Sequence, residues 1–374
     1  MIIKTPQQYV NQPDILQSAG ESIAQFGKNA LLIGGKTALT VIGGKFFDSL
    51  ATAGVTLTIE QYHSYCTEEA IEQYVETAQR LKADIIIGAG GGKILDLAKA
   101  VGDQSQIPII TVPTIAATCA AWSALSILYD ENGCFAGSRS LNHSPQLVLV
   151  DTRIISEAPV RFLRAGIADT LAKWYELTPY FADAESELAL KIGLHHAKLA
   201  FNGLHEKGIR AIQDATNHHL SEVLREVIDS IIVLAGLVGS ITEGSYHLAL
   251  GHAIHNSLTF IPETHQSLHG EKVIFGVLSQ LILQGKSAVE IAEFVTSING
   301  LKLPLTLEQL GIFDVSKTAA EVKRSIQIDA AAFSKFPFPV SPELIEEAII
   351  KANRIGKESL NKGGIYHEPD IMAI

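Results

Sequence analysis

The sequence predicts two domains, an α/β N-terminal domain with a mostly parallel sheet and an all-α C-terminal domain. In the first part of the chain, short β-rich runs alternate with stretches of helical periodicity, which is typical of a parallel sheet with helices on both faces. After Pro159 the β-branched runs almost stop and helical periodicity dominates. We therefore place the first domain in residues 1–160 and the second in residues 161–374.

The expected strands are apolar runs bounded by turn residues. They are residues 30–34, 55–59, 84–87, 107–112 and 147–150. Before the last of these, Asn132 and Gly133 form a turn signal, so we expect a hairpin around residues 127–135. The positions at which we expect helices of the second domain to break are Pro179, Pro262, Pro304 and residues 336–342.

Composition favours a globular protein that acts on small molecules. The 374 residues are enough for two cores, and 47% of them are hydrophobic while 18% are charged. A net charge of −11 argues against nucleic acid or an anionic membrane as a partner, which leaves a small-molecule substrate. Three cysteines without a C-x-x-C pattern support neither disulfides nor a cysteine zinc site, and they fit a reducing cytoplasm. The longest apolar run, residues 231–241, is about half a membrane span and predicts a buried helix.

A glycine cluster follows the apolar run 84–87. Gly90, Gly91 and Gly92 precede Lys93, and the helix that follows carries Asp96. Because glycines let the backbone N–H groups of a helix N-terminus approach a phosphate, the cluster predicts a nucleotide-cofactor site. It is neither a P-loop, since no Ser or Thr follows the lysine, nor the usual G-x-G-x-x-G. The alternative is a tight strand-to-helix turn that binds no ligand.

Two histidine pairs flank a proline in the second domain. His252 and His255 precede Pro262, and His265 and His269 follow it. Imidazole is a common ligand of divalent transition metals, and a helix on each side of the proline could bring one histidine of each pair to the same ion. The alternative is that these histidines pack or cap helices. The residues alone do not choose between the two, nor within either pair.

An anionic third ligand would help to neutralise such an ion, and Asp169 is a candidate. It lies on a predicted helix whose apolar stripe is on the opposite side from Asp169, Lys173 and Glu176. An i,i+4 pair of Asp169 with Lys173 on a solvated face explains the spacing equally well. Without further information the residues favour this second interpretation.

Taken together, these segments resemble the glycerol dehydrogenase branch of the iron-containing alcohol dehydrogenase family. The resemblance covers most of residues 6–285 and rests on several motifs that follow one another in order. The motifs are residues 90–96, 112–117, 123–126, 158–161, 165–169, 252–256 and 269–273. The resemblance implies the dehydroquinate synthase-like architecture, with a dinucleotide-binding α/β domain and a helical metal-binding domain, and it implies a homo-oligomer.

The same resemblance assigns roles to the histidines and the aspartate. Asp169, His252 and His269 become ligands of a divalent metal, which is usually zinc in this branch. Lys173 stands where other branches place a fourth ligand, which supports a site with three protein ligands. His255 or His265 could then relay protons. The positions that would hold NAD or NADP are Gly90, Gly91, Gly92, Lys93, Asp96, Thr114, Ser123, Leu125 and Tyr129.

Two positions depart from the glycerol branch. Gly35, with Lys36 beside it, replaces an aspartate that binds the adenosine ribose, so NADP is at least as plausible as NAD. Cys119 replaces an aspartate that hydrogen-bonds the polyol, so glycerol loses a specific partner. The stretch from Cys119 to Trp122 looks more like a hydroxycarboxylate dehydrogenase sub-branch that reduces short 2-oxo acids, and both residues are candidates for substrate contact.

The sequence therefore predicts a metal-dependent NAD(P)-linked oxidoreductase that interconverts a small alcohol and its carbonyl, with a 2-hydroxy acid and 2-oxo acid as the expected pair. Glycerol is the alternative substrate. A dehydroquinate-synthase-like lyase is the alternative of another class, but it needs a cluster of cations around a phosphate, and the histidine-rich region offers only Lys272. A non-catalytic module that binds metal and nucleotide is a weaker alternative.

Overall fold

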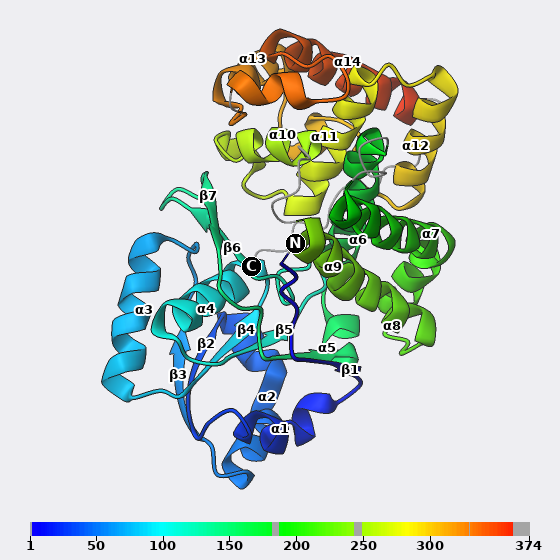
Figure 1. Cartoon of the computed structure of the whole chain (residues 1–374). Helices are drawn as coiled ribbons and strands as arrows, with labels where there is room; N and C mark the ends of the chain where they lie inside the picture. The colour runs from blue at the N-terminus through cyan, green and yellow to red at the C-terminus, as the bar shows by residue number, and fades with distance from the viewer. Residues whose placement is uncertain (1, 182–186, 243–248, 329, 362–374) are drawn as a thin grey trace.

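The structure, a computed structural model, describes residues 2–181, 187–242, 249–328 and 330–361. Figure 1 shows a sheet with its covering helices in the lower half of the view and a helical region in the upper half. This arrangement confirms the predicted fold class, a parallel α/β domain followed by helices. The helix that opens the second part begins at Val160, and the division of the chain into two domains at residue 160 stays a prediction.

The sheet has six strands in the order β1-β8-β5-β4-β2-β3, and all neighbouring strands are parallel. The five predicted strands are present, and the sixth, β1, pairs with β8 at one edge. Their bounds are β1 Gln8–Gln12, β2 Asn29–Gly34, β3 Thr56–Gln61, β4 Ile85–Gly90, β5 Ile109–Pro113 and β8 Leu147–Asp151.

Helices cover both faces of this sheet because successive residues of its central strands point to opposite sides. Leu31 of β2 packs with the cluster under α3 and α4, whereas Leu32 packs with the cluster under α1 and α2. The predicted hairpin is present as the antiparallel pair β6 and β7. The bounds are α1 Gly20–Ala24, α2 Lys36–Thr52, α3 Glu68–Leu81, α4 Gly92–Ser105, β6 Leu125–Tyr129, β7 Phe135–Ser140 and α5 Thr152–Glu157.

The described residues of the second part form helices joined by loops and no strand, with a π-helical turn at Ser230–Leu234. Its core is continuous with part of the first domain, because Val148 and Val150 of β8 belong to the same apolar cluster as residues of α6, α10 and α11. None of the described helices is both long and apolar enough to cross a bilayer. The bounds are α6 Val160–Leu177, α7 Leu188–Thr216, α8 Glu222–Asp229, α9 Ala235–Thr242, α10 Leu250–Leu258, α11 His269–Leu283, α12 Ala288–Gly300, α13 Val315–Ser325 and α14 Pro342–Asn361.

Glycines let α6, α10 and α11 pack at very short range. A Cβ on Gly270 of α11 would overlap the backbone carbonyl of Ala165 in α6. A Cβ on Gly276 would come within 2.5 Å of the carbonyl oxygen of Gly251 in α10. Since any larger residue would push these helices apart, the glycines fix the distance between the side chains that the three helices direct toward one another.

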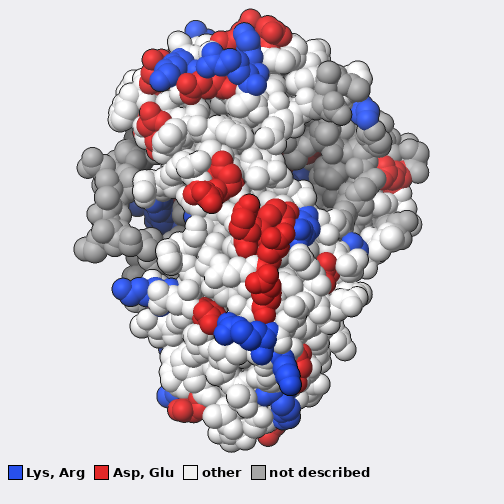
Figure 2. All heavy atoms as spheres, turned by 90° about the vertical axis from the view of Figure 1, so that its left-hand side faces the viewer, with Lys and Arg blue, Asp and Glu red and all other residues white. Residues whose placement is uncertain are grey.

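Acidic side chains gather on one face of the molecule. Figure 2 views the side on which α3 lies in Figure 1, and a column of acidic residues runs through the centre of this face. Basic side chains lie in separate groups above and below the column. This distribution agrees with the net charge of −11.

Candidate metal and nucleotide site

Three of the predicted site residues meet between three helices. Asp169 comes from α6, His252 from α10, and His269 is the first residue of α11. The Oδ1 atom of Asp169 lies 3.2 Å from Nε2 of His252 and 3.2 Å from Nε2 of His269. The possible ligand atoms all lie within 4.8 Å of one another. One carboxylate and two imidazoles are a donor set that suits zinc and related divalent ions, so these residues fit the metal site that the sequence predicts.

Glu176 orients the first histidine. Its two carboxylate oxygens lie 2.9 and 2.8 Å from Nδ1 of His252, and one of them also accepts the backbone N–H of His252. Asp169 and Glu176 are each only 3% exposed. The interpretation of Asp169, Lys173 and Glu176 as a solvated face is therefore wrong. Their side of α6 is covered by α10 and α11, which the periodicity of a single helix cannot reveal.

His255 contacts His269 on the side of the ring that faces away from Asp169. Its Nε2 lies 3.1 Å from Nδ1 of His269, and its Nδ1 lies 2.9 Å from Oδ1 of Asn256. The structure thus places His255 against a predicted ligand, where it can fix the ring of His269 as well as relay a proton. His265 instead contacts the backbone carbonyl of Thr259. Either relay role stays a prediction.

The electrostatics of the cluster favour a positive charge among the three side chains. Burial alone would raise the pKa of Asp169, but Lys173 and the two histidines outweigh it and hold the pKa well below its usual range. Burial alone would lower the pKa of His252, but Glu176 and Asp169 raise it to about 9. Burial lowers the pKa of His255 well below its usual value, so this ring is neutral. A bound cation would take the place of the proton that His252 otherwise holds.

The glycine cluster forms the turn between β4 and α4. Gly90 has a φ of 155°, a backbone conformation that favours glycine, and Gly91 caps α4 without any side-chain hydrogen bond. A Cβ on Gly91 would come within 2.8 Å of the Ile115 side chain. Lys93 stands in the first turn of α4, with its ammonium 3.9 Å from the ring centroid of Tyr65. The open N-terminus of α4 beside a lysine fits a phosphate group.

Comparison with known proteins agrees with this geometry. Residues 6–152 match the model of the family described as iron-containing alcohol dehydrogenase. A glycolaldehyde reductase of Halobacterium salinarum is 35% identical over 95% of this chain and 98% of its own length. The chain belongs to the iron-containing alcohol dehydrogenase family. Hydroxycarboxylate dehydrogenase A of Escherichia coli is 32% identical over 86% of this chain and 88% of its own length. The solved structure of a Schizosaccharomyces pombe glycerol dehydrogenase has a TM-score of 0.88 and 26% identity, and the match covers 99% of this chain and 95% of that one.

In this family member, Asp96 is a buried positioning residue. It is 5% exposed and lies 2.9 Å from Nζ of Lys99, which is completely buried. The Lys99 ammonium also donates to the backbone carbonyl and the hydroxyl of Ser123, both at 3.1 Å, and to the carbonyl of Leu125 at 2.5 Å. The pair thereby holds the segment that carries Ser123 and Leu125. Direct contact of these residues with a cofactor stays a prediction.

Thr114 and Tyr129 lie near the same turn. The backbone N–H of Thr114 donates to the carbonyl of Gly90 at 3.1 Å. The Tyr129 ring packs on the ring of Tyr65 with centroids 5.8 Å apart, and Tyr65 in turn lies under the ammonium of Lys93. Sequence reasoning missed Tyr65, because it lies in the loop between β3 and α3 and belongs to no motif.

Cys119 lies within electrostatic range of the metal cluster, whereas Trp122 is part of the core. Burial raises the pKa of the Cys119 thiol, Lys173 opposes this effect, and Asp169 adds to it, so the charges of Lys173 and Asp169 both act on the thiol. Trp122 is only 7% exposed and its ring packs on Tyr9 with centroids 6.0 Å apart. The position of Cys119 agrees with a role in substrate contact. For Trp122 such a role stays a prediction that its burial does not favour.

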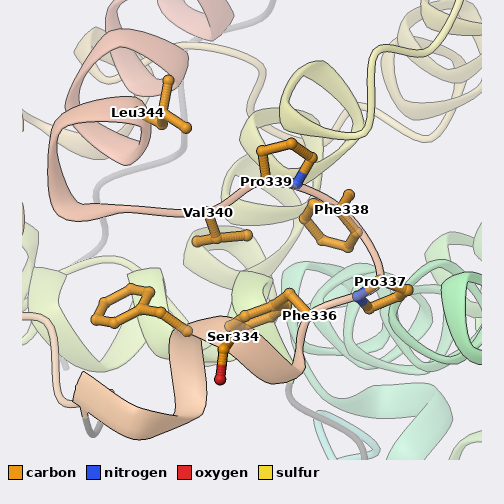
Figure 3. Close-up of a pocket in the computed structure, with 8 residues that line it drawn as sticks. Ser334, Phe336, Pro337, Phe338, Pro339, Val340 and Leu344 are labelled. Carbon is orange, nitrogen blue, oxygen red and sulfur yellow. The ribbon is translucent and has the colours of Figure 1, made fainter.

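A separate pocket is lined by the segment that leads from α13 to α14 and by the first turn of α14. Figure 3 shows that Phe336, Phe338 and Val340 line it together with two prolines and Leu344. Its volume is about 520 Å³, and its lining residues include no acid, histidine or lysine. Apart from the hydroxyl of Ser334, its lining side chains are apolar.

Proposed function

We propose that this protein is a metal-dependent NAD(P)-linked oxidoreductase that interconverts a small 2-hydroxy acid and the corresponding 2-oxo acid. The observation that carries the proposal is the convergence of Asp169, His252 and His269 from three helices in a chain whose β4–α4 turn fits a phosphate. Membership of an alcohol dehydrogenase family favours this reaction over the lyase alternative.

The residues have distinct parts in the proposed chemistry. A divalent ion, zinc in our proposal, would act as a Lewis acid on the substrate oxygen while the nicotinamide ring exchanges hydride with the substrate carbon. Glu176 fixes the ring of His252, and His255 fixes the ring of His269, so both Nε2 atoms face Asp169. His255 is also the residue that we propose to exchange a proton with the reacting oxygen through a water molecule.

The choice of a 2-oxo acid rests on the surroundings of Cys119. A thiol at this position cannot accept hydrogen bonds from a polyol as a carboxylate does. Lys173 is a neighbour of Cys119, and it keeps a raised pKa because Cys119, Asp169 and Glu176 outweigh the effect of burial. A permanent positive charge at this point favours a substrate that carries a carboxylate. The similarity to hydroxycarboxylate dehydrogenase A supports the same choice.

The second candidate is a neutral substrate, glycerol or a short hydroxyaldehyde. It is supported by the similarity to a glycolaldehyde reductase and to the structure of a glycerol dehydrogenase. The first candidate requires that the site prefer a negatively charged substrate, and the second does not.

A substrate panel separates these candidates. Purified protein loaded with zinc, or with ferrous iron in a parallel arm, is assayed with NADH and NADPH against pyruvate, glycolaldehyde and dihydroxyacetone, and in the oxidative direction against glycerol. We expect the largest kcat/KM for pyruvate. The variant Cys119→Asp should lower that value and raise the value for glycerol, while Cys119→Ser serves as the uncharged control. Efficient glycerol oxidation without pyruvate reduction would overturn the choice of substrate, and absence of turnover with every substrate would overturn the proposed function.

A further inference from the structure

A second lysine lies near the glycine turn, and the site described so far does not use it. Lys272 belongs to the first turn of α11, three residues after His269 and therefore on the same side of that helix. It is only 6% exposed. A lysine is seldom this buried unless an anion balances its charge.

The neighbouring acid does not supply that balance. Glu271 binds the guanidinium of Arg161 at 2.6 Å and accepts the backbone N–H of Leu268 at 2.7 Å. Burial and the nearby Lys93, only partly offset by Glu271, lower the pKa of Lys272 to about 8. Among the residues that the structure describes, no carboxylate lies within ion-pair distance of Lys93 or Lys272.

Lys272 is linked electrostatically to both parts of the site, and its place on α11 puts it on the side of His269. Its charge lowers the pKa of His255, which contacts the predicted ligand His269, and it also lies close enough to Lys93 for mutual repulsion. Lys93 belongs to the N-terminal domain and follows the glycine turn directly, whereas Lys272 belongs to the helical region. Two cations from different parts of the chain thus repel one another, and neither forms an ion pair with a carboxylate of the described residues.

We propose that Lys93 and Lys272 together form an anion site that holds a phosphate group of the dinucleotide from two sides. The inference rests on the proposed function and adds Lys272 to its cofactor contacts. Lys93 and the open N-terminus of α4 approach the phosphate from the N-terminal domain, and the Lys272 ammonium approaches it from the helical region. The carboxylate of a 2-oxo acid is also an oxyanion that accepts hydrogen bonds from lysine, and it is the other candidate for the anion at this site.

Direct binding measurements test the site without turnover. We would measure the dissociation constant of ADP-ribose, which carries the pyrophosphate but no nicotinamide, by calorimetry on the metal-loaded protein. Lys272→Met should weaken binding about 10-fold or more, because it removes a charged hydrogen-bond donor, and Lys272→Arg should retain most of the affinity. Lys317→Met changes an exposed lysine of α13 and serves as the matched control, with unchanged affinity expected.

Thermal unfolding separates this role from a structural one. Removing a buried charge that lacks a partner should leave the melting temperature of the ligand-free protein unchanged or raise it. The rise in melting temperature on adding ADP-ribose should become smaller in Lys272→Met. A merely structural lysine would give the reverse, a lower melting temperature with an unchanged response to the ligand.

Kinetic measurements with two substrates show whether the bound anion is the phosphate of the dinucleotide or the carboxylate of the substrate. If ADP-ribose binding is unchanged in Lys272→Met while the KM of pyruvate rises and that of glycolaldehyde does not, the anion site stands and its ligand is the substrate carboxylate. If ADP-ribose affinity and both KM values are unchanged, the anion site is overturned. Because ADP-ribose binding needs no turnover, tight binding by the unmodified protein without activity would overturn the proposed function and leave this inference standing.

Discussion

At the scale of single residues, the site also depends on groups that no motif marks. Glu176 is the clearest example, because its carboxylate makes two contacts with Nδ1 of His252 and one with the backbone of the same residue. A carboxylate behind an imidazole raises the basicity of the ring and fixes its orientation. Glu176 therefore acts on the metal through His252 and does not bind the metal or the substrate itself.

The variant Glu176→Gln tests this role. It keeps the size of the side chain but removes the charge, so we expect metal affinity to fall about 10- to 100-fold with the fold intact. Zinc titration against a chelator of known affinity measures the change. Glu347→Gln, on an exposed position of α14, is the control. Equal zinc affinity in both variants would show that Glu176 does not support the site.

Gly35 offers a second test at this scale. It caps α2 with a φ of −71°, and a Cβ there would meet only the Ile94 side chain, at 3.9 Å, so a larger residue fits without strain. We expect the unmodified protein to accept NADPH, and Gly35→Asp to reduce the preference for NADPH over NADH by about 10-fold or more, since a carboxylate repels the 2′-phosphate. Gly35→Asn, which adds a similar volume without charge, is the control. If both variants change the ratio equally, size rather than charge is responsible.

The residue scale also shows what sequence can and cannot decide. The two histidine pairs have similar local surroundings, so the choice of His252 and His269 came from a family resemblance and not from spacing. The structure shows why spacing was insufficient. His255 is directed to His269 rather than to Asp169, and this depends on how α10 is rotated against α11.

At the scale of helices and strands, apolar content decided which elements were predictable. Four of the five predicted strands, β2, β4, β5 and β8, are buried on both faces or nearly so, and they read as continuous apolar runs. The fifth, β3, is an edge strand that is exposed or half-buried, and its β-branched residues predicted it. The strand that was missed, β1, spans Gln8–Gln12 and has only Tyr9 and Val10 as apolar residues. It is held instead by long-range contacts, because Tyr9 and Asn11 both donate to Oδ1 of Asp229 at 2.6 and 2.7 Å. Such partners lie too far along the chain for a local pattern to reveal them.

The close packing of α6 on α11 leads to a prediction for Gly270. A methyl group at this position would overlap the backbone of Ala165, so α11 must move away from α6. We expect Gly270→Ala to lower the free energy of unfolding by about 1 to 3 kcal/mol and to weaken zinc binding, since His269 precedes the glycine. Chemical denaturation and zinc titration measure the two effects. Gly239→Ala in α9, where a Cβ meets nothing within 4 Å, should leave both unchanged or raise stability slightly.

At the scale of the whole molecule, the proposed metal joins α6 to two helices that come much later in the sequence, α10 and α11. Asp169 and His269 are separated by 100 residues. An ion bound by both, and by His252, would stabilise the folded chain by about 2.7 kcal/mol at 100 times its dissociation constant. Removing the ion with a chelator should therefore lower the melting temperature.

This stabilisation should depend on pH through His252. In the metal-free protein the raised pKa of about 9 contributes stability that is complete below pH 6.5 and is lost as the pH rises toward 9. Metal binding has the opposite dependence, because the ion must displace the proton. We expect the gain in melting temperature on adding zinc to be larger at pH 8.0 than at pH 6.5, by the equivalent of about 2 kcal/mol. Equal gains at both pH values would exclude His252 as a ligand that exchanges a proton for the metal.

The shared core between β8 and the helices has a consequence for building hybrids of related enzymes. Val148 and Val150 come from the sheet, but the apolar cluster that covers them comes from the helical region. A chimera that joins residues 1–160 of this chain to the helices of a relative would bring together two surfaces that were never selected to fit. Exchange of substrate preference between relatives should therefore succeed more readily through short segments, such as the turn that carries Cys119, than through whole domains.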